Sequence, residues 1–418
     1  MTEIDKPKIM PLGDVLQNNL VIPYYQRPYR WKAEKHVKQL IEDIDRELNN
    51  TTDYRIGSII LHKNDIVDGQ QRLVTVALIL NVLTPNFNTS LFKQEFRHAD
   101  SKDNIKYNYN YINSYYSIYD NSEKEKIAHF ILTHCSVIVV KLNELSEAFQ
   151  LFDSQNARGK ALDPVDLLKA YHLREMQDNT ELEKKNCVAN WEKAINANIL
   201  NTVVGKHLFR IRNWKKHNQV YNFTKDDIDQ FKGVNVLRLI QSGKFYPYLA
   251  VSFQTSISTH FVIDETIING HRFFNYINHY VEIYRDLKTF QDDSTKHDLS
   301  FYYSGWYRTG DKRLKSLFVT MLMCYVDKFG YDDCFKEFTQ ELYRWIYVNR
   351  LMSPQIRYQT VRDIANSSDN PISLVDSWFT PDIKTIRRSV KKIADIDIKK
   401  DITDLKACLL KLENNGRS

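Results

Sequence analysis

The feature that most constrains the fold is a short strand that ends in an acid and passes through one glycine into an apolar helix. Ile66-Val67-Asp68 is β-branched, so it predicts a strand, and Gly69 breaks it. The residues that follow, Gln70–Leu83, are almost all apolar and predict a mostly buried helix. Because this run is short and contains Thr75 and Asn81, we expect no membrane span.

Strands and helices alternate in the N-terminal third, and helices fill the rest. Further strands are expected at Tyr54–His62 and Cys135–Leu142, which are short and β-branched. Leu91–Lys126 is polar and rich in Tyr and Asn, which indicates an insertion whose secondary structure the pattern does not specify. The other helices expected are Glu34–Leu48, Glu144–Asp153, Glu181–Leu200, Lys225–Gln241, Glu265–Asp292, Lys312–Phe329 and Asp332–Leu351.

This order of elements predicts an α+β fold with a mixed α/β domain at 1–175 and a mostly α-helical domain at 176–418. Only 12 glycines and 10 prolines occur, which favours long helices. The five scattered cysteines form no CxxC pair, so we expect a reducing compartment, the cytoplasm, rather than a disulfide framework. The N-terminus has no signal-peptide pattern. A net charge of +6 permits a polyanionic partner without requiring one.

The first candidate site is the segment IPYYQRPYRW at 22–31. Its two prolines restrict the backbone and predict a rigid, extended segment. Arginines between aromatic residues can be held against a phosphate, so we predict that Tyr25, Gln26, Arg27 and Arg30 bind nucleotide or phosphate. The alternative is an edge segment whose aromatic side chains fill the core while the arginines face water.

The second candidate site is Asp68-Gly69-Gln70-Gln71-Arg72. Free backbone N–H groups at a helix start form an anion site, and Arg72 adds a fork-shaped cation. Asp68 could bind Mg²⁺ or orient a water, while Gln70 and Gln71 position water or substrate. The alternative is a corner whose polar groups only cap the helix.

The third candidate is the loop Ser154–Leu162, with Asn156, Arg158 and Lys160 around Gly159. It precedes a helix that Asp163 caps and Pro164 begins. A phosphate-facing loop and a solvated basic turn explain it equally well.

Two basic runs are less specific. The run from Arg210 to His217 interleaves basic and aromatic residues, which would suit DNA backbone contact, but we expect a solvated helix face. Arg387-Arg388 with Lys391-Lys392 has the same two explanations. The sequence contains no HExxH, GxSxG or Walker-type motif. Its last histidine is His297, so the residues after it cannot supply a histidine-dependent HNH nuclease site.

Together and in this order, three motifs resemble the N-terminal domain family of GmrSD-type, modification-dependent restriction endonucleases, which has a ParB/sulfiredoxin-like fold. They are IPYYQRPYRW at 22–31, VDGQQRLVT at 67–75 and FDSQNARGKALDPVDLLKAY at 152–171. The resemblance implies a site for binding and hydrolysing NTP at Asp68, Gln70, Gln71 and Arg72, with the segment Ile22–Arg27 beside it, and we predict that Gly69 contacts the phosphate. It covers about the first 171 residues.

The resemblance further implies a defence protein that acts on DNA, including modified phage DNA. Since the downstream histidines are missing, we expect an NTPase-type sensor or regulatory component that works with a separate nuclease subunit, and homo-oligomers are compatible with this plan. The alternative is a non-enzymatic ParB-like adaptor that binds DNA.

Overall fold

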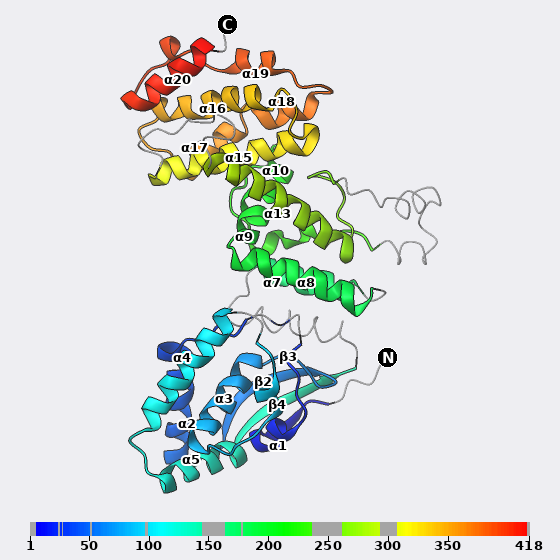
Figure 1. Cartoon of the computed structure of the whole chain (residues 1–418), viewed down its shortest axis with the longest axis vertical. Coiled ribbons are helices and arrows are strands. Elements are labelled where there is room, and N and C mark those ends of the chain that lie inside the picture. The colour runs from blue at the N-terminus through cyan, green and yellow to red at the C-terminus, as the bar shows by residue number, and fades with distance from the viewer. Residues whose placement is uncertain are drawn as a thin grey trace, which may run out of the picture. The chain divides into compact units, whose positions relative to one another are not determined.

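The computed structural model describes residues 6–23, 26, 28–50, 52–96, 99–143, 164–176, 179–235, 261–292 and 307–415. The chain divides into two compact units, 1–162 and 163–418, which Figure 1 colours blue to cyan and green to red. The second unit therefore begins before the boundary that we predicted at residue 175. Helix α7 (Pro164–Arg174) belongs to it because His172 accepts a hydrogen bond from the backbone of Gly270 and stacks on Phe273.

The first unit contains a four-stranded mixed sheet in the order β1-β4-β2-β3. Strand β2 (Tyr54–His62) is parallel to β4 (Cys135–Leu142) and antiparallel to β3 (Asp65–Asp68). These three confirm the predicted strands. Strand β1 (Lys8–Pro11) pairs antiparallel with β4 and was not predicted, because four residues that end in proline carry little strand signal.

Helices connect the strands of this unit. They are α1 (Leu12–Gln17), a π-helical turn (Ala33–Val37) leading into α2 (Lys38–Asn50), α3 (Gln70–Leu83), a 3₁₀ turn (Ser90–Lys93), α4 (Ala99–Tyr116) and α5 (Asn121–Thr133). Helices α4 and α5 supply the structure of Leu91–Lys126, which the sequence pattern had left open. Two signals fix α5, namely a capping box between Asp120 and Glu123 and an apolar face that is buried.

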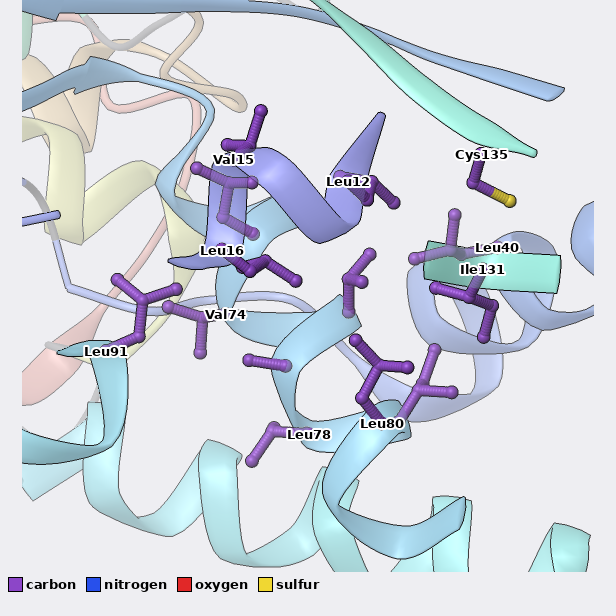
Figure 2. Close-up of a cluster of buried hydrophobic side chains, with 14 of the residues drawn as sticks. Leu12, Val15, Leu16, Leu40, Val74, Leu78, Leu80, Leu91, Ile131 and Cys135 are labelled. Carbon is purple, nitrogen blue, oxygen red and sulfur yellow. The ribbon is translucent and has the colours of Figure 1, made fainter. Parts of the chain in front are cut away.

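Helix α3 is the centre of the core of this unit. It is buried on nearly all sides and packs against α4 and α5. In the close-up of Figure 2, Val74, Leu78 and Leu80 of α3 lie among side chains from other elements, including Leu16 and Ile131. Each fully buried side chain of this size contributes about 1.5–3 kcal/mol, so this helix anchors the corner from which it begins.

The second unit is helical within its described residues. Besides α7 it contains α8 (Glu181–Asn196), α9 (Leu200–Thr202), a π-helical turn (Val203–Leu208), α10 (Phe209–Trp214), a 3₁₀ helix (Lys225–Phe231), α13 (His271–Asp292), α15 (Thr309–Phe329), α16 (Phe335–Met352), α17 (Tyr358–Ala365), α18 (Pro371–Ser377), α19 (Ile383–Ser389), a 3₁₀ turn (Ile393–Asp395) and α20 (Thr403–Asn415). The α+β class is confirmed. None of the described helices combines the length and the apolar character of a membrane span.

Two predicted helices in this unit were too long. The helix predicted at Lys225–Gln241 is a 3₁₀ helix that ends at Phe231, and the one predicted from Glu265 begins at His271. One contact explains both differences. Val234 donates its backbone N–H to Ile267 and accepts from Asn269, so these backbone groups pair across a bridge and cannot continue a helix. The helices predicted at Lys312–Phe329 and Asp332–Leu351 are confirmed as α15 and α16.

The basic run after Arg210 does not form the solvated helix face that we expected. Arg210, Ile211 and Trp214 are all buried in α10. Arg387, in the other run, is tied by ion pairs to Glu337 and Glu341 of α16.

Candidate functional site

The corner between β3 and α3 has the geometry of an anion site. Strand β3 ends at Asp68, Gly69 takes the left-handed backbone conformation with φ 98°, and α3 begins at Gln70. A Cβ at Gly69 would lie 2.5 Å from Cγ2 of Ile59, so only glycine fits without displacing β2. No side chain within the described ranges caps α3, so its first N–H groups remain available to a ligand.

Arg72 and Asp68 lie one helical turn apart and face each other. Nη2 of Arg72 donates to Oδ2 of Asp68 at 3.1 Å, and each side chain is about one quarter exposed. The guanidinium also lies across Gly57 of β2, where a Cβ would be 2.4 Å from Nη1 of Arg72. The absence of a side chain at Gly57 therefore leaves room for the cation.

The two glutamines of the corner differ in what they contact. Oε1 of Gln71 accepts from the backbone N–H groups of Arg30 and Trp31 at 2.8 and 3.2 Å, and its Nε2 donates to the carbonyl of Pro28 at 3.2 Å. Gln70 is only 4% exposed, and its Oε1 has no hydrogen-bond partner among the described residues. Such an orphaned acceptor costs about 1–3 kcal/mol, which a donor on a ligand or a water would offset.

The described residues of the segment 22–31 lie directly against this corner. Nε2 of Gln26 donates to the carbonyls of Ile66 and Val67 at 2.8 and 2.6 Å, so Gln26 fastens the segment to β3. The side chain of Arg30 is exposed. Tyr25 and Arg27, which we predicted to bind phosphate, lie outside the described residues. The structure thus brings the described residues of the first motif against the second motif, as the family resemblance implied.

Helix α4 supplies positioning residues that the sequence reasoning missed. Ser101, Asn104 and Asn108 face Tyr29–Trp31: Ser101 accepts from the Tyr29 N–H, Asn104 donates to the Tyr29 carbonyl, and Asn108 donates to the Trp31 carbonyl. Their i, i+3, i+7 spacing marks one helix face and was the signal that could have revealed them. It was overlooked because polar stripes usually face water.

The ring of Tyr29 completes this attachment inside the core. Its hydroxyl contacts Thr75 of α3 at 2.7 Å and accepts from Asn108 at 2.9 Å. Burial raises the pKa of Tyr29, so the phenol stays neutral. Its hydroxyl therefore acts as a hydrogen-bond donor and acceptor in a fixed position. Helices α3 and α4 therefore hold the segment from both sides.

Two family models match the chain. Residues 12–173 match the family described as GmrSD restriction endonuclease, N-terminal domain, which confirms the resemblance seen in the three motifs. Residues 183–403, more than half of the chain, match a family of unknown function (DUF7834). The chain belongs to the DUF7834 family and carries a GmrSD-type N-terminal domain. No curated protein matches it. The N-terminal match connects the chain with restriction of DNA and with defence.

The third candidate site of the GmrSD-type domain, the loop Ser154–Leu162 with Asn156, Arg158 and Lys160, lies outside the described residues. Within the described ranges no three His, Cys, Asp or Glu side chains come together as a metal site. Asp68 is thus a single carboxylate beside the uncapped helix start.

Proposed function

We propose that the Asp68–Arg72 corner binds an NTP and hydrolyses it, and that the chain is a sensor or regulatory component of a DNA restriction or antiphage system. The observation that carries this proposal is the uncapped start of α3 behind the left-handed Gly69, with the Arg72 guanidinium beside it. Backbone N–H groups bind phosphate oxygens there, and Arg72 neutralises their charge. The match to the GmrSD family supports the connection with restriction.

The ion pair between Asp68 and Arg72 does not prevent a phosphate from binding. Both side chains are partly exposed, and ion pairs of this kind contribute only about 0–1 kcal/mol. A phosphate offers Arg72 two oxygens and more charge than one carboxylate, so it competes effectively. Once Arg72 turns to the phosphate, the Asp68 carboxylate is free to accept a proton from water.

Mg²⁺ would suit Asp68 in this arrangement. The ion is commonly held by one or two carboxylates, with phosphate oxygens and waters as its other ligands, so a single carboxylate is sufficient. When bound, the ion would neutralise phosphate charge. Gln70, whose Oε1 has no hydrogen-bond partner among the described residues, would accept a hydrogen bond from water or from a nucleotide hydroxyl. Gln71 instead acts as a positioning residue, because its amide already holds Pro28–Trp31.

Release of inorganic phosphate tests the proposal. The full chain is incubated with Mg²⁺ and each of the four NTPs, with and without DNA. We expect release in the wild type and its loss in Asp68→Ala and Arg72→Ala. Lys38→Ala is the matched control, because Lys38 forms an exposed i, i+4 ion pair with Glu42 on α2, which contributes no residue to the corner. Release that both corner variants retain in full would place hydrolysis elsewhere.

The same assay separates the second candidate, an adaptor that binds DNA without hydrolysis. The exposed Arg30 beside the corner favours it, because a phosphate of a DNA strand can use the same donors. A wild type that releases no phosphate under any condition, yet binds DNA in an Arg30-dependent way, would replace the NTPase with the adaptor.

A further inference from the structure

A cavity of about 540 Å³ lies within the second unit, at the starts of α15 and α17. Its lining includes four basic side chains, Lys206, Arg210, Lys312 and Arg313, and its described lining contains no acid. Ligand pockets typically measure about 300–1,000 Å³, so this one is large enough for a nucleotide. All lining residues belong to unit 163–418, so the cavity is distinct from the Asp68 corner.

Arg210 is the strongest sign that an anion belongs here. It is 3% exposed, its Nε donates to the carbonyl of Tyr221 and its Nη1 to the Ser316 hydroxyl. Neither partner is charged, and no carboxylate among the described residues pairs with it. A buried charge without a counter-charge is costly, and a bound anion would relieve that cost.

Stacking holds both arginines of the cavity in fixed positions. The guanidinium of Arg210 lies 3.7 Å from the ring centre of Tyr221, and that of Arg313 lies 4.1 Å from the ring centre of Tyr358. The two rings are 4.6 Å apart, so arginine, tyrosine, tyrosine and arginine form one continuous cluster. A fork-shaped donor held in this way loses little freedom when it binds phosphate.

Two exposed lysines of the lining add positive charge on flexible side chains to this cluster. Lys206 and Lys312 are exposed, and neither forms an ion pair with a described residue. Lys206 stands on the π-helical turn Val203–Leu208, a local irregularity that often occurs at functional sites. Lys312 is in the first turn of α15, whose N-terminus favours negative charge.

We infer that this cavity binds the phosphate of a nucleotide, either free or as part of a single DNA strand. Two stacked arginines provide the fixed donors, two lysines attract the anion, and the absence of described acids in the lining keeps the field positive. The inference does not depend on NTP hydrolysis at Asp68. It assigns a ligand class to the helical unit, which matches a family of unknown function.

Binding of two probes to the full chain tests the inference. The probes are ATP without Mg²⁺ and a labelled 20-nucleotide oligo-dT, each titrated at two salt concentrations. The Lys206→Gln/Lys312→Gln double variant changes only exposed side chains, so we expect it to fold. The matched control is Lys216→Gln, an exposed lysine of the same unit outside the cavity. All variants are also made in the Arg72→Ala background, which removes the cation of the first site.

We expect the double variant to weaken binding of at least one probe roughly tenfold while Lys216→Gln leaves it unchanged. If the double variant loses affinity for oligo-dT, the phosphate belongs to a DNA strand. In that case the slope of log K against log salt should also be reduced by about 1.4, as expected for two lost phosphate contacts. A loss for ATP alone identifies a free nucleotide. Equal binding of both probes by the double variant and by Lys216→Gln, in both backgrounds, would overturn the inference. A single Lys312→Glu variant provides the same comparison if the double variant is unstable.

Discussion

Replacement of Gln71 by leucine tests whether this residue positions the segment 28–31 or handles substrate. Gln71 accepts two backbone N–H groups, those of Arg30 and Trp31, and donates to the carbonyl of Pro28. Leucine is similar in size but offers no donor or acceptor, so all three groups lose their partner. Only the bond to Pro28 is fully buried; the other two are partly buried and regain water.

The expected magnitude follows from these three bonds. A buried polar group left unpaired costs about 1–3 kcal/mol, and two partly solvated bonds add about 0.5 kcal/mol each. We therefore expect the free energy that holds the segment in place to fall by about 2–4 kcal/mol. A domain is typically stable by about 5–15 kcal/mol, so the unit should remain folded while this segment opens.

Hydrogen exchange, measured by mass spectrometry on peptides that cover residues 28–37, reports directly how often this segment opens. We expect the amides of Arg30 and Trp31 to exchange at least roughly tenfold faster in Gln71→Leu, since 1.4 kcal/mol is a factor of ten. Gln39→Leu is the control, because Gln39 is exposed on α2. Unchanged protection at both amides, combined with lost phosphate release, would refute a positioning role and make Gln71 a substrate-handling residue.

Three further predictions follow from single contacts. Gly57→Ala should weaken ATP binding, because its Cβ would displace the Arg72 guanidinium; calorimetric titration checks this, and unaltered affinity would count against the site. Asn108→Ala removes two hydrogen bonds to the Tyr29–Trp31 segment and should lower the unfolding free energy by about 1–3 kcal/mol in urea; a stability equal to wild type would contradict this role. Burial lowers the pKa of His172 to about 3 in the native chain. Between pH 6.5 and 3, His172 is therefore protonated in the unfolded chain and neutral in the native chain. The free energy of unfolding should therefore fall by up to about 1.4 kcal/mol per pH unit as the pH drops toward 3, and it should fall less in His172→Gln. If urea unfolding gave the same pH dependence in wild type and variant, this linkage would be excluded.

Elements whose signal is local were predictable from the sequence. Strands β2 and β4 and helix α3 have the predicted bounds, because β-branched runs and an apolar helix set off by Gly69 point to one conformation each. The Asp68–Arg72 corner was predictable for the same reason, since strand, glycine and helix follow one another directly in the chain.

Elements that depend on distant partners were not predictable. The helix expected at Lys225–Gln241 is cut short at Phe231 because Val234 pairs with residues near 268, far along the chain. The helices α4 and α5 were missed because their polar composition hides a face that is buried only in the folded unit. Likewise, burial of Arg210 depends on Tyr221 and Ser316, which no helical spacing connects to it.

The sequence by itself therefore determined the corner and its charged residues, because their positions follow from the local backbone. Only the tertiary structure decided what each residue contacts. It paired the Gln71 side chain with the backbone of residues 28–31 and buried Arg210. Among the described residues, it left Oε1 of Gln70 without a hydrogen-bond partner and Arg210 without a carboxylate partner. The physical reason is that hydrogen-bond partners and burial are set by segments that meet in space, whereas propensity and turn chemistry act within a few residues.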